Sequence, residues 1–302
     1  MIMPTDKPDG IPQGMLDEMN RRLAITMNAR NAAPDPEMGG LSPNQVTRLI
    51  YTEWGEPGAA VQFNTDIPLA DLEKAEFFRK TRAFLKALHA AGDVRATTSK
   101  NLSRRFVTEA LPLMFSKEEI DEIYKYNKVV NEQDVPHLHY ARIVSKLAGL
   151  VRLYKGKFGI PKSKAALLRD DRAGELFRFL FIAFFRKFNL AYAHRVVFEA
   201  RGLQTCAAYT LYRLGVAAKE WTLVDALPMK VLLPAVREEI EAEIYGYEYW
   251  TEAELLTSRL IRWFIEWGIL EGRYEQEDKF FKPLKAVRIT PLYAAALRFN
   301  IE

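Results

Sequence analysis

The chain has 302 residues, of which 49% are hydrophobic and 12% aromatic, so it can bury a sizeable core spread over two or three domains. Its net charge of +4 is small for this length, so the total charge alone does not indicate that the protein binds a polyanion. Because Cys206 is the only cysteine, the chain cannot form an intrachain disulfide or a multi-cysteine zinc site. We therefore expect a cytoplasmic protein from a reducing compartment.

The first 40 residues are rich in Pro, Asp, Asn and Gly and contain one short helical pattern. They predict a flexible N-terminal arm over residues 1–40, with a helix over residues 15–28 and no apolar centre of signal-peptide type. The richest apolar run, residues 176–197, contains charged side chains such as Arg178 and Arg186. Charges at these intervals are costly in a lipid bilayer, so we expect a buried helix or helix pair and no membrane partner.

Cap residues mark further helices along the chain. Ser42 followed by Pro43 predicts a helix start, since serine accepts a bond from the first turn and proline suits its first position. Ser116 with Glu119 three residues later is typical of a capping box. Two more helices are expected over residues 201–214 and 232–244.

One pattern occurs three times: an amphipathic helix ends at a glycine, a short apolar strand follows, and after a gap a second helix begins. The glycines concerned are Gly92, Gly149 and Gly268. Glycine permits the left-handed conformation that ends a helix sharply, and the apolar residues after it suit a strand. This order of elements is the closing half of a winged-helix unit. The alternative is a helical scaffold with incidental hairpins.

The expected fold class is therefore mainly α and multi-helical, with about three winged-helix-like units, each containing a helix-turn-helix, and short β-hairpins. We assign residues 41–130 to an N-terminal helical or winged-helix-like unit, and residues 131–215 to a middle unit with a long packing helix. Residues 216–302 are assigned to a C-terminal winged-helix-like unit.

Charge is distributed unevenly, with a basic middle and an acidic end. In a winged helix that binds DNA, the helix before the glycine enters the major groove, so its exposed side chains should be basic. The candidate nucleic-acid-binding residues are accordingly Arg79, Lys80, Arg82, Lys86, Lys100, Arg104, Arg105, Arg142, Lys146, Arg152, Lys155 and Lys157. His139, on the same predicted helix as Arg142, is a further polar side chain of that helix. A solvated helix face is the other interpretation of these cations.

The gaps between the paired strands differ between the copies. In the second copy, residues 154–159 carry two lysines and two glycines, a composition expected of an exposed turn that touches phosphates. In the third copy the gap is acidic and aromatic, with Glu275, Glu277, Asp278, Phe280 and Phe281. The helix before that gap carries Trp263 and Trp267, which we assign to partner binding. The third unit is thus expected to contact protein rather than nucleic acid.

Common catalytic signatures are absent from the sequence, including the phosphate loop, the dinucleotide-binding turn, the nucleophile elbow and HExxH. Asp134, His137 and His139 are residue types that bind zinc or manganese, but a capping role for Asp134 is favoured, and no metal site is assigned. Cys206 with His194 is the remaining nucleophilic combination, and we expect a core thiol instead. No cofactor and no catalytic residue is expected.

Residues 41–111 carry an LSP opening, a strand with phenylalanine and asparagine, and a later NL, R, F pattern. The residues concerned are Leu41, Ser42, Pro43, Phe63, Asn64, Thr97, Asn101, Leu102, Arg105 and Phe106. In these features the chain resembles a family of uncharacterised bacterial and plasmid-borne proteins. Some relatives carry a cysteine-rich SEC-C zinc segment, which this chain lacks. The resemblance implies a bacterial, intracellular protein and no particular activity.

We expect a non-catalytic protein that binds nucleic acid, with DNA favoured and a regulatory role. The alternative is a protein-interaction scaffold without a nucleic-acid ligand, which includes self-association. A metal-dependent enzyme built around His137 and His139 is the least favoured of the three classes.

Overall fold

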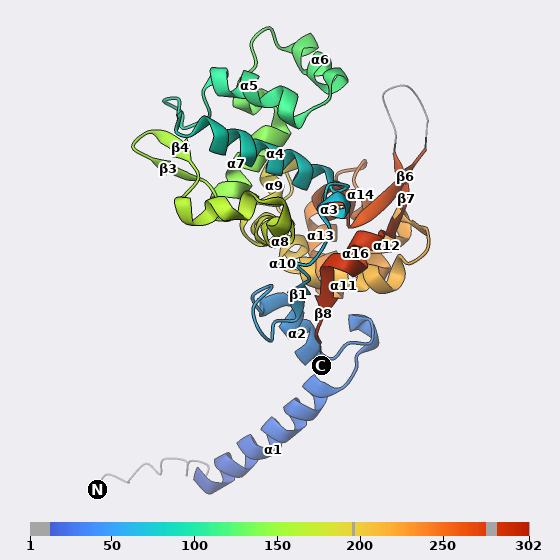
Figure 1. Cartoon of the computed structure of the whole chain (residues 1–302). Coiled ribbons are helices and arrows are strands. Elements are labelled where there is room, and N and C mark those ends of the chain that lie inside the picture. The colour runs from blue at the N-terminus through green and yellow to red at the C-terminus, as the bar shows by residue number, and fades with distance from the viewer. Residues whose placement is uncertain (1–12, 195–196, 276–282, 302) are drawn as a thin grey trace, which may run out of the picture.

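The computed structural model describes residues 13–194, 197–275 and 283–301, with the backbone alone for His194 (Figure 1). These residues form a mainly helical fold with three small antiparallel sheets, so the predicted mainly α class is confirmed. Within the same ranges, no helix is both long enough and apolar enough to span a membrane.

Helix α1 (Gln13–Ala32) extends away from the rest of the molecule and buries none of its residues (Figure 1). Met15, Met19, Leu23 and Met27 are 52–61% exposed. Their regular spacing of four residues places them on one side of the helix. The predicted helix is therefore confirmed, and it carries an exposed apolar face.

Helix α2 (Pro43–Tyr51) begins at the predicted cap, after the short helix η1 (Pro36–Met38). The Ser42 hydroxyl accepts from the Gln45 backbone, and the Gln45 side chain accepts from the Ser42 backbone, so both form a capping box. Val46, Leu49 and Ile50 are buried on one face.

Strand β1 (Val61–Phe63) pairs antiparallel with β8 (Leu297–Phe299), which comes from the other end of the described chain. The Asn64 amide donates to the Ala295 carbonyl oxygen over 3.1 Å and extends this contact. The two ends of the body are thereby joined.

The next elements build a single three-stranded sheet. In chain order they are α3 (Leu69–Leu72), α4 (Glu76–Ala91), β2 (Val94–Arg95), α5 (Arg104–Met114), α6 (Lys117–Tyr126), η2 (Glu132–Asp134), α7 (Pro136–Leu147), β3 (Arg152–Tyr154) and β4 (Lys157–Gly159). Strand β4 pairs with both neighbours, which gives the order β2-β4-β3. The first copy of the repeated pattern supplies β2, and the second supplies β3 and β4. The prediction of a separate winged-helix-like unit for the first copy is wrong, because its strand β2 pairs with β4 of the second copy across the intervening helices.

A long buried segment follows this sheet. The elements are η3 (Lys162–Leu168), η4 (Asp170–Arg172), α8 (Ala173–Ile182), the π-helix η5 (Ala183–Lys187), α9 (Leu190–His194) and α10 (Arg201–Thr205). Phe177, Phe181, Phe184 and Phe185 are at most 1% exposed. The part of the apolar run that lies in α8 and η5 is therefore buried and helical, as predicted, whereas Tyr192 and Val197 near its end are exposed.

The C-terminal part builds a second sheet with the same strand order. Its elements are α11 (Ala207–Ala217), β5 (Thr222–Leu223), η6 (Val224–Ala226), α12 (Leu227–Val231), α13 (Pro234–Ile244), α14 (Glu252–Leu256), the π-helix η7 (Thr257–Ile261), α15 (Arg262–Glu266), β6 (Leu270–Tyr274), β7 (Leu284–Ile289) and α16 (Pro291–Ala296). Strand β7 lies between β5 and β6. The three predicted helix-ending glycines, Gly92, Gly149 and Gly268, all have φ between 67° and 71°, a range that glycine adopts at little cost. Gly92 differs from a left-handed cap in its ψ of −121°.

Trp267 lies at the centre of the core with no exposed surface. Its ring centroid is 5.3 Å from that of Phe77 and 5.1 Å from that of Phe181. Trp263 is 5% exposed and packs 4.7 Å from Phe184. The assignment of both tryptophans to partner binding is therefore wrong, because large aromatic rings bury the most apolar area when they fill the core.

The exposed face of α1 predicts that polar substitutions there leave the body unaffected. Changing Met19 and Leu23 to Ser should leave the Tm unchanged, because neither side chain is buried. Trp267→Ala, in contrast, should cost about 3–5 kcal/mol through the cavity it leaves. Thermal and urea unfolding followed by circular dichroism would measure both. A clear fall in Tm for the α1 variant would contradict the placement of this helix.

Candidate nucleic-acid interface

The sheet β2-β4-β3 has one buried face and one exposed face. Val94 and Leu153 both pair with Phe158 and form the inner row, in which Phe158 is 1% exposed. Arg95 and Tyr154 both pair with Lys157 and form the outer row. Because paired residues share a face and successive residues alternate, the three polar side chains of the outer row stand together on the solvent side.

The outer face is extended by the hairpin that joins β3 to β4. Arg152 precedes Tyr154 by two residues and shares its face. The Arg152 guanidinium carbon lies 5.6 Å from the centre of the Tyr154 ring, and the Lys155 ammonium lies 5.4 Å from it. Tyr154 is 60% exposed. An aromatic ring flanked by two cations is thus presented to solvent.

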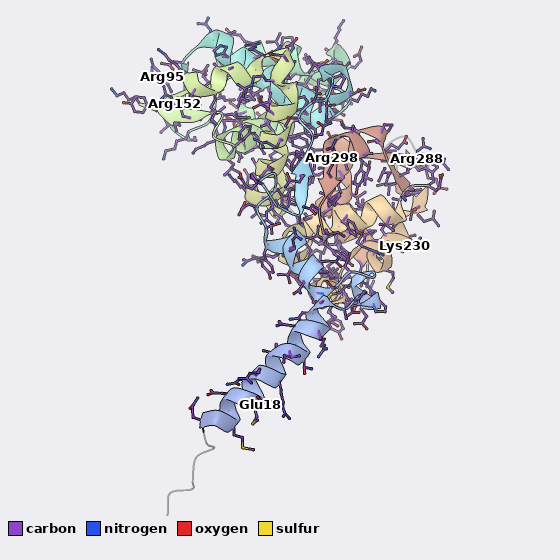
Figure 2. All side chains as sticks on the ribbon, turned by 60° about the horizontal axis from the view of Figure 1, so that its bottom comes forward. Glu18, Arg95, Arg152, Lys230, Arg288 and Arg298 are labelled. Atoms are coloured by element: carbon purple, nitrogen blue, oxygen red, sulfur yellow. The ribbon has the colours of Figure 1, made fainter. Side chains whose placement is uncertain are left out.

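The hairpin turn has the backbone that a two-residue connection needs. Lys155 and Gly156 have φ values of 47° and 72°, the positive pair of a type I′ turn. The Gly156 carbonyl oxygen accepts from the Ala96 backbone over 2.8 Å, which ties the turn to the loop that carries Lys100. Arg95 and Arg152 therefore lie at the same edge of the molecule, away from Arg288 and Arg298 (Figure 2).

One carboxylate faces these cations. Asp93 lies 3.7 Å from the Lys157 ammonium. Among the residues that the structure describes, Arg95, Arg152 and Lys155 have no ion-pair partner. We call Arg95, Arg152, Tyr154, Lys155 and Lys157 the basic sheet face.

Two of the predicted cations on α4 are buried in ion pairs. Lys80 is 2% exposed, with its ammonium 2.7 Å from Glu119 and also hydrogen-bonded to Glu76. Arg82 is 6% exposed and pairs with Glu73 and Asp170. Their assignment to nucleic-acid binding is wrong, because helical periodicity alone does not distinguish a paired, buried cation from an exposed one.

The predicted groove-entering helix, α7, turns His139 and Arg142 inward, while its Lys146 is exposed. It packs against both α4 and η5. Glu132, 1% exposed, accepts from Arg142 Nε and from His139 Nδ1, each over 2.6 Å, and from the Leu102 backbone over 2.5 Å. Arg142 is 8% exposed, so its assignment to nucleic-acid binding is wrong as well.

Burial alone would raise the pKa of Glu132, but the hydrogen bond from His139 and the charge of Arg142 hold it below its ordinary value. The carboxylate is therefore charged at neutral pH and fixes both partners in the interior. His139 completes its contacts through Nε2, which lies 2.9 Å from the Tyr192 hydroxyl.

The remaining predicted cations lie on the surface of this half of the molecule. Lys86 pairs with Asp170 and Arg105 with Glu109. The Arg104 side chain donates to Asn131 over 2.8 Å. Exposed positions without a described ion-pair partner are Arg79, Lys100 and Lys146. Of the twelve predicted residues, the hairpin brings together Arg152, Lys155 and Lys157.

Sequence reasoning missed two members of the basic sheet face, Arg95 and Tyr154. The available signal was the alternation of Val94 with Arg95 directly after a helix-ending glycine. That alternation predicts one buried and one exposed position, but the strand's partner is set by the tertiary fold.

The predicted ligand cluster of Asp134, His137 and His139 does not converge. Asp134 accepts from the Asn131 backbone over 2.8 Å and so belongs to the capping box of η2. The favoured role of Asp134 as the N-cap of α7 is wrong, because Val135 occupies that position without a side-chain hydrogen bond. His137 instead lies 3.3 Å from Glu266, and with Glu76 these side chains place one ligand-type atom each within 4.8 Å of one another. Lys80 already neutralises Glu76, so we assign no metal to this group.

Two further predictions concern the C-terminal half. Cys206 is buried, which raises its thiol pKa to about 11 and keeps it protonated, while the side chain of His194 lies outside the described part. In the acidic gap, Glu275 pairs with Lys285 over 2.8 Å. The other predicted members of that gap, Glu277, Asp278, Phe280 and Phe281, lie outside the described residues.

The network around Glu132 predicts a large stability effect. Glu132→Gln should destabilise the protein by about 3–5 kcal/mol, because Arg142 would remain buried without a counter-charge. Glu109→Gln, which removes a surface pair, is the matched control and should leave the midpoint of urea unfolding in place.

The pH dependence follows from the lowered pKa of Glu132. A carboxylate of this kind contributes stability above its unfolded pKa, near 4.5, and loses it as the pH falls through the folded value. Below about pH 4.5 the native chain should approach the stability of the Glu132→Gln variant. Equal losses in both proteins over this range would contradict the assigned network.

Residues 73–174 match the family model of the Y4jL N-terminal domain, an uncharacterised family. This stretch runs from the end of α3 to the first turn of α8 and contains the whole sheet β2-β4-β3. No curated protein matches the chain. No solved structure matches it either. The part of the chain that carries the basic sheet face is thus similar to the Y4jL N-terminal domain.

Proposed function

We propose that the protein binds nucleic acid without catalysing a reaction, with DNA as the favoured ligand, through the basic sheet face. The observation that carries this proposal is the outer row of Arg95, Lys157 and Tyr154, flanked by Arg152 and Lys155. Cations beside an exposed aromatic ring suit phosphate contact together with base or sugar stacking.

The order of elements supports a winged-helix interpretation of this part of the chain. A helix, a strand, further helices and a two-stranded hairpin follow one another, and the first strand pairs with the last. In this interpretation the turn at Lys155 and Gly156 is the wing, and α7 occupies the place of the groove-reading helix.

The inward side chains of α7 favour contact through the wing rather than through the helix. His139 and Arg142 are held by Glu132 and do not face solvent. The remaining contacts are cations suited to phosphates, which position a protein on nucleic acid but carry no sequence information. We therefore propose binding with low sequence specificity.

The second sheet, β5-β7-β6, has a similar strand order, but two of its arginines contact other side chains. Arg273 and Arg288 lie 4.3 and 4.7 Å from the Trp221 ring, and Arg288 is hydrogen-bonded to Glu271. This half suits a structural role better than phosphate contact.

The alternative function is a protein-interaction scaffold. The exposed apolar face of α1 favours it, because apolar patches of this kind commonly mark association sites. If this alternative holds, the native chain should sediment with a partner or as an oligomer, and changing Met19 and Leu23 to Ser should abolish the association.

Fluorescence anisotropy with duplex and single-stranded DNA over a salt series tests the proposed function. Three to four phosphate contacts predict a slope of log affinity against log salt of about −3. Changing Lys155 to Gln should weaken binding of every sequence and reduce the slope by about 1.

Lys230→Gln is the matched control, since Lys230 is an exposed lysine far from the basic sheet face (Figure 2). It should bind like the native chain. Absence of binding at about 50 mM salt, or equal effects of both substitutions, would rule out the proposed interface.

A further inference from the structure

A cavity of about 460 Å³ lies between α2, η5, α10 and η7, and none of its lining residues belongs to the basic sheet face. Three arginines line it: Arg186 from η5, Arg201 from α10 and Arg259 from η7. Glu199 is the acidic residue among the described lining residues. The cavity therefore carries an excess of positive charge.

Arg259 is the most unusual of these side chains because it is 2% exposed and has no ion-pair partner among the described residues. Its guanidinium donates to the carbonyl oxygens of Ala191, over 3.3 Å, and Phe198. Its Nε atom is buried without a hydrogen-bond partner. A buried charge normally has a counter-charge, since desolvation costs several kcal/mol.

Burial lowers the pKa of Arg259, and the charge of Glu243 opposes this shift. Glu243 forms no ion pair with the guanidinium, and its carboxylate accepts from the Ala200 backbone over 2.8 Å. The guanidinium is thus left with neutral acceptors and an unused donor.

The other two arginines of the cavity differ in their partners. Arg186 donates to the Ile50 carbonyl oxygen over 3.0 Å and stacks 5.7 Å from the Trp54 ring, again without a carboxylate. Arg201 pairs with Glu199 over 2.7 Å, and its side chain is 81% exposed. Two of the three cations are therefore bonded to neutral groups only.

The backbone around the cavity has features that are concentrated at functional sites. Arg186 and Arg259 both come from π-helical turns, which are rare and frequently mark such sites. Ala200, also in the lining, is buried in the left-handed conformation with φ 38°. For a residue other than glycine, this backbone conformation is strained.

We infer that this cavity binds a small molecule with a phosphate monoester group, which Arg186, Arg201 and Arg259 contact. Planar guanidinium groups match the geometry of phosphate oxygens and form charge-assisted hydrogen bonds with them. The volume suits a ligand of the size of a sugar phosphate or a mononucleotide. Binding would supply the counter-charge that Arg259 lacks.

Isothermal titration of the full chain with AMP, ribose 5-phosphate, adenosine and inorganic phosphate tests this inference. AMP or ribose 5-phosphate should bind, and adenosine should not, because it lacks the phosphate. Binding of both esters would identify a sugar phosphate as sufficient, and binding of AMP alone would identify a nucleotide. Equal affinity for AMP and adenosine, or for inorganic phosphate and both esters, would overturn the inference.

Substitutions then locate the site. Arg186→Gln and Arg201→Gln should each weaken binding about tenfold, the effect expected for one charge-assisted hydrogen bond. Arg213→Gln is the matched control, because Arg213 is also bonded to carbonyl oxygens, of Gly39 and Lys230, but lies outside the cavity lining.

Three results would overturn the assignment. They are no heat of binding at ligand concentrations up to about 1 mM, equal affinities of the Arg186 and Arg213 variants, and unchanged affinity in Arg201→Gln. Lys155→Gln, which tests the basic sheet face, should leave phosphate binding unchanged, so failure of one proposal is distinguishable from failure of the other.

Discussion

The packing of aromatic rings around Trp267 is the interaction on which the rest of the structure depends. Trp267 ends α15 of the C-terminal half, and Phe77 begins α4 of the N-terminal half, yet their rings are 5.3 Å apart. Phe177 and Phe181 of α8 lie 5.4 and 5.1 Å from the same indole. This cluster joins α4, α8 and α15. It therefore fixes the positions of the helices that precede β2 and β6, one strand of each three-stranded sheet. The basic sheet face and the arginine-lined cavity are at its periphery.

A second constraint is that the buried cations of the N-terminal half are paired with carboxylates. Glu132 holds Arg142 and His139 in the interior, and Glu119 with Glu76 does the same for Lys80. Paired in this way, the cations stabilise the packing of α4 and α7 and are removed from the surface. On the sheet β2-β4-β3, in contrast, Arg95, Arg152 and Lys157 stay exposed, because alternation along a strand turns every second residue to the solvent.

Local features of the fold were predictable from the sequence, and long-range ones were not. The helix cap at Ser42 and the capping box at Ser116 depend on residues at most three apart, and both form as expected. The glycine stops are equally local. The pairing of Arg95 with Lys157, however, joins two copies of a repeated pattern across four helices, and nothing in either segment specifies the other. The candidate site was therefore predicted in part, at its hairpin, while its third strand was missed.

The same distinction explains the errors in the cationic residues. A lysine at position 80 has the same helical spacing whether it faces solvent or two glutamates from another turn and another helix. Only the tertiary fold brings Glu119 within 2.7 Å of it. Arg259 is the converse case, since its sequence neighbours are ordinary and its isolation from carboxylates is a property of the assembled core.

The pairing of β1 with β8 bears on how the chain reaches this structure during synthesis. The bond from Asn64 to Ala295 spans 231 positions, so closing this loop costs on the order of 5 kcal/mol of chain entropy before any contact repays it. At ribosomal rates of about 5–20 residues per second, β1 waits roughly 10–50 s for its partner strand. Throughout that interval its hydrogen-bonding edge is open to other chains, which makes this strand the point where a nascent chain is most exposed to mispairing.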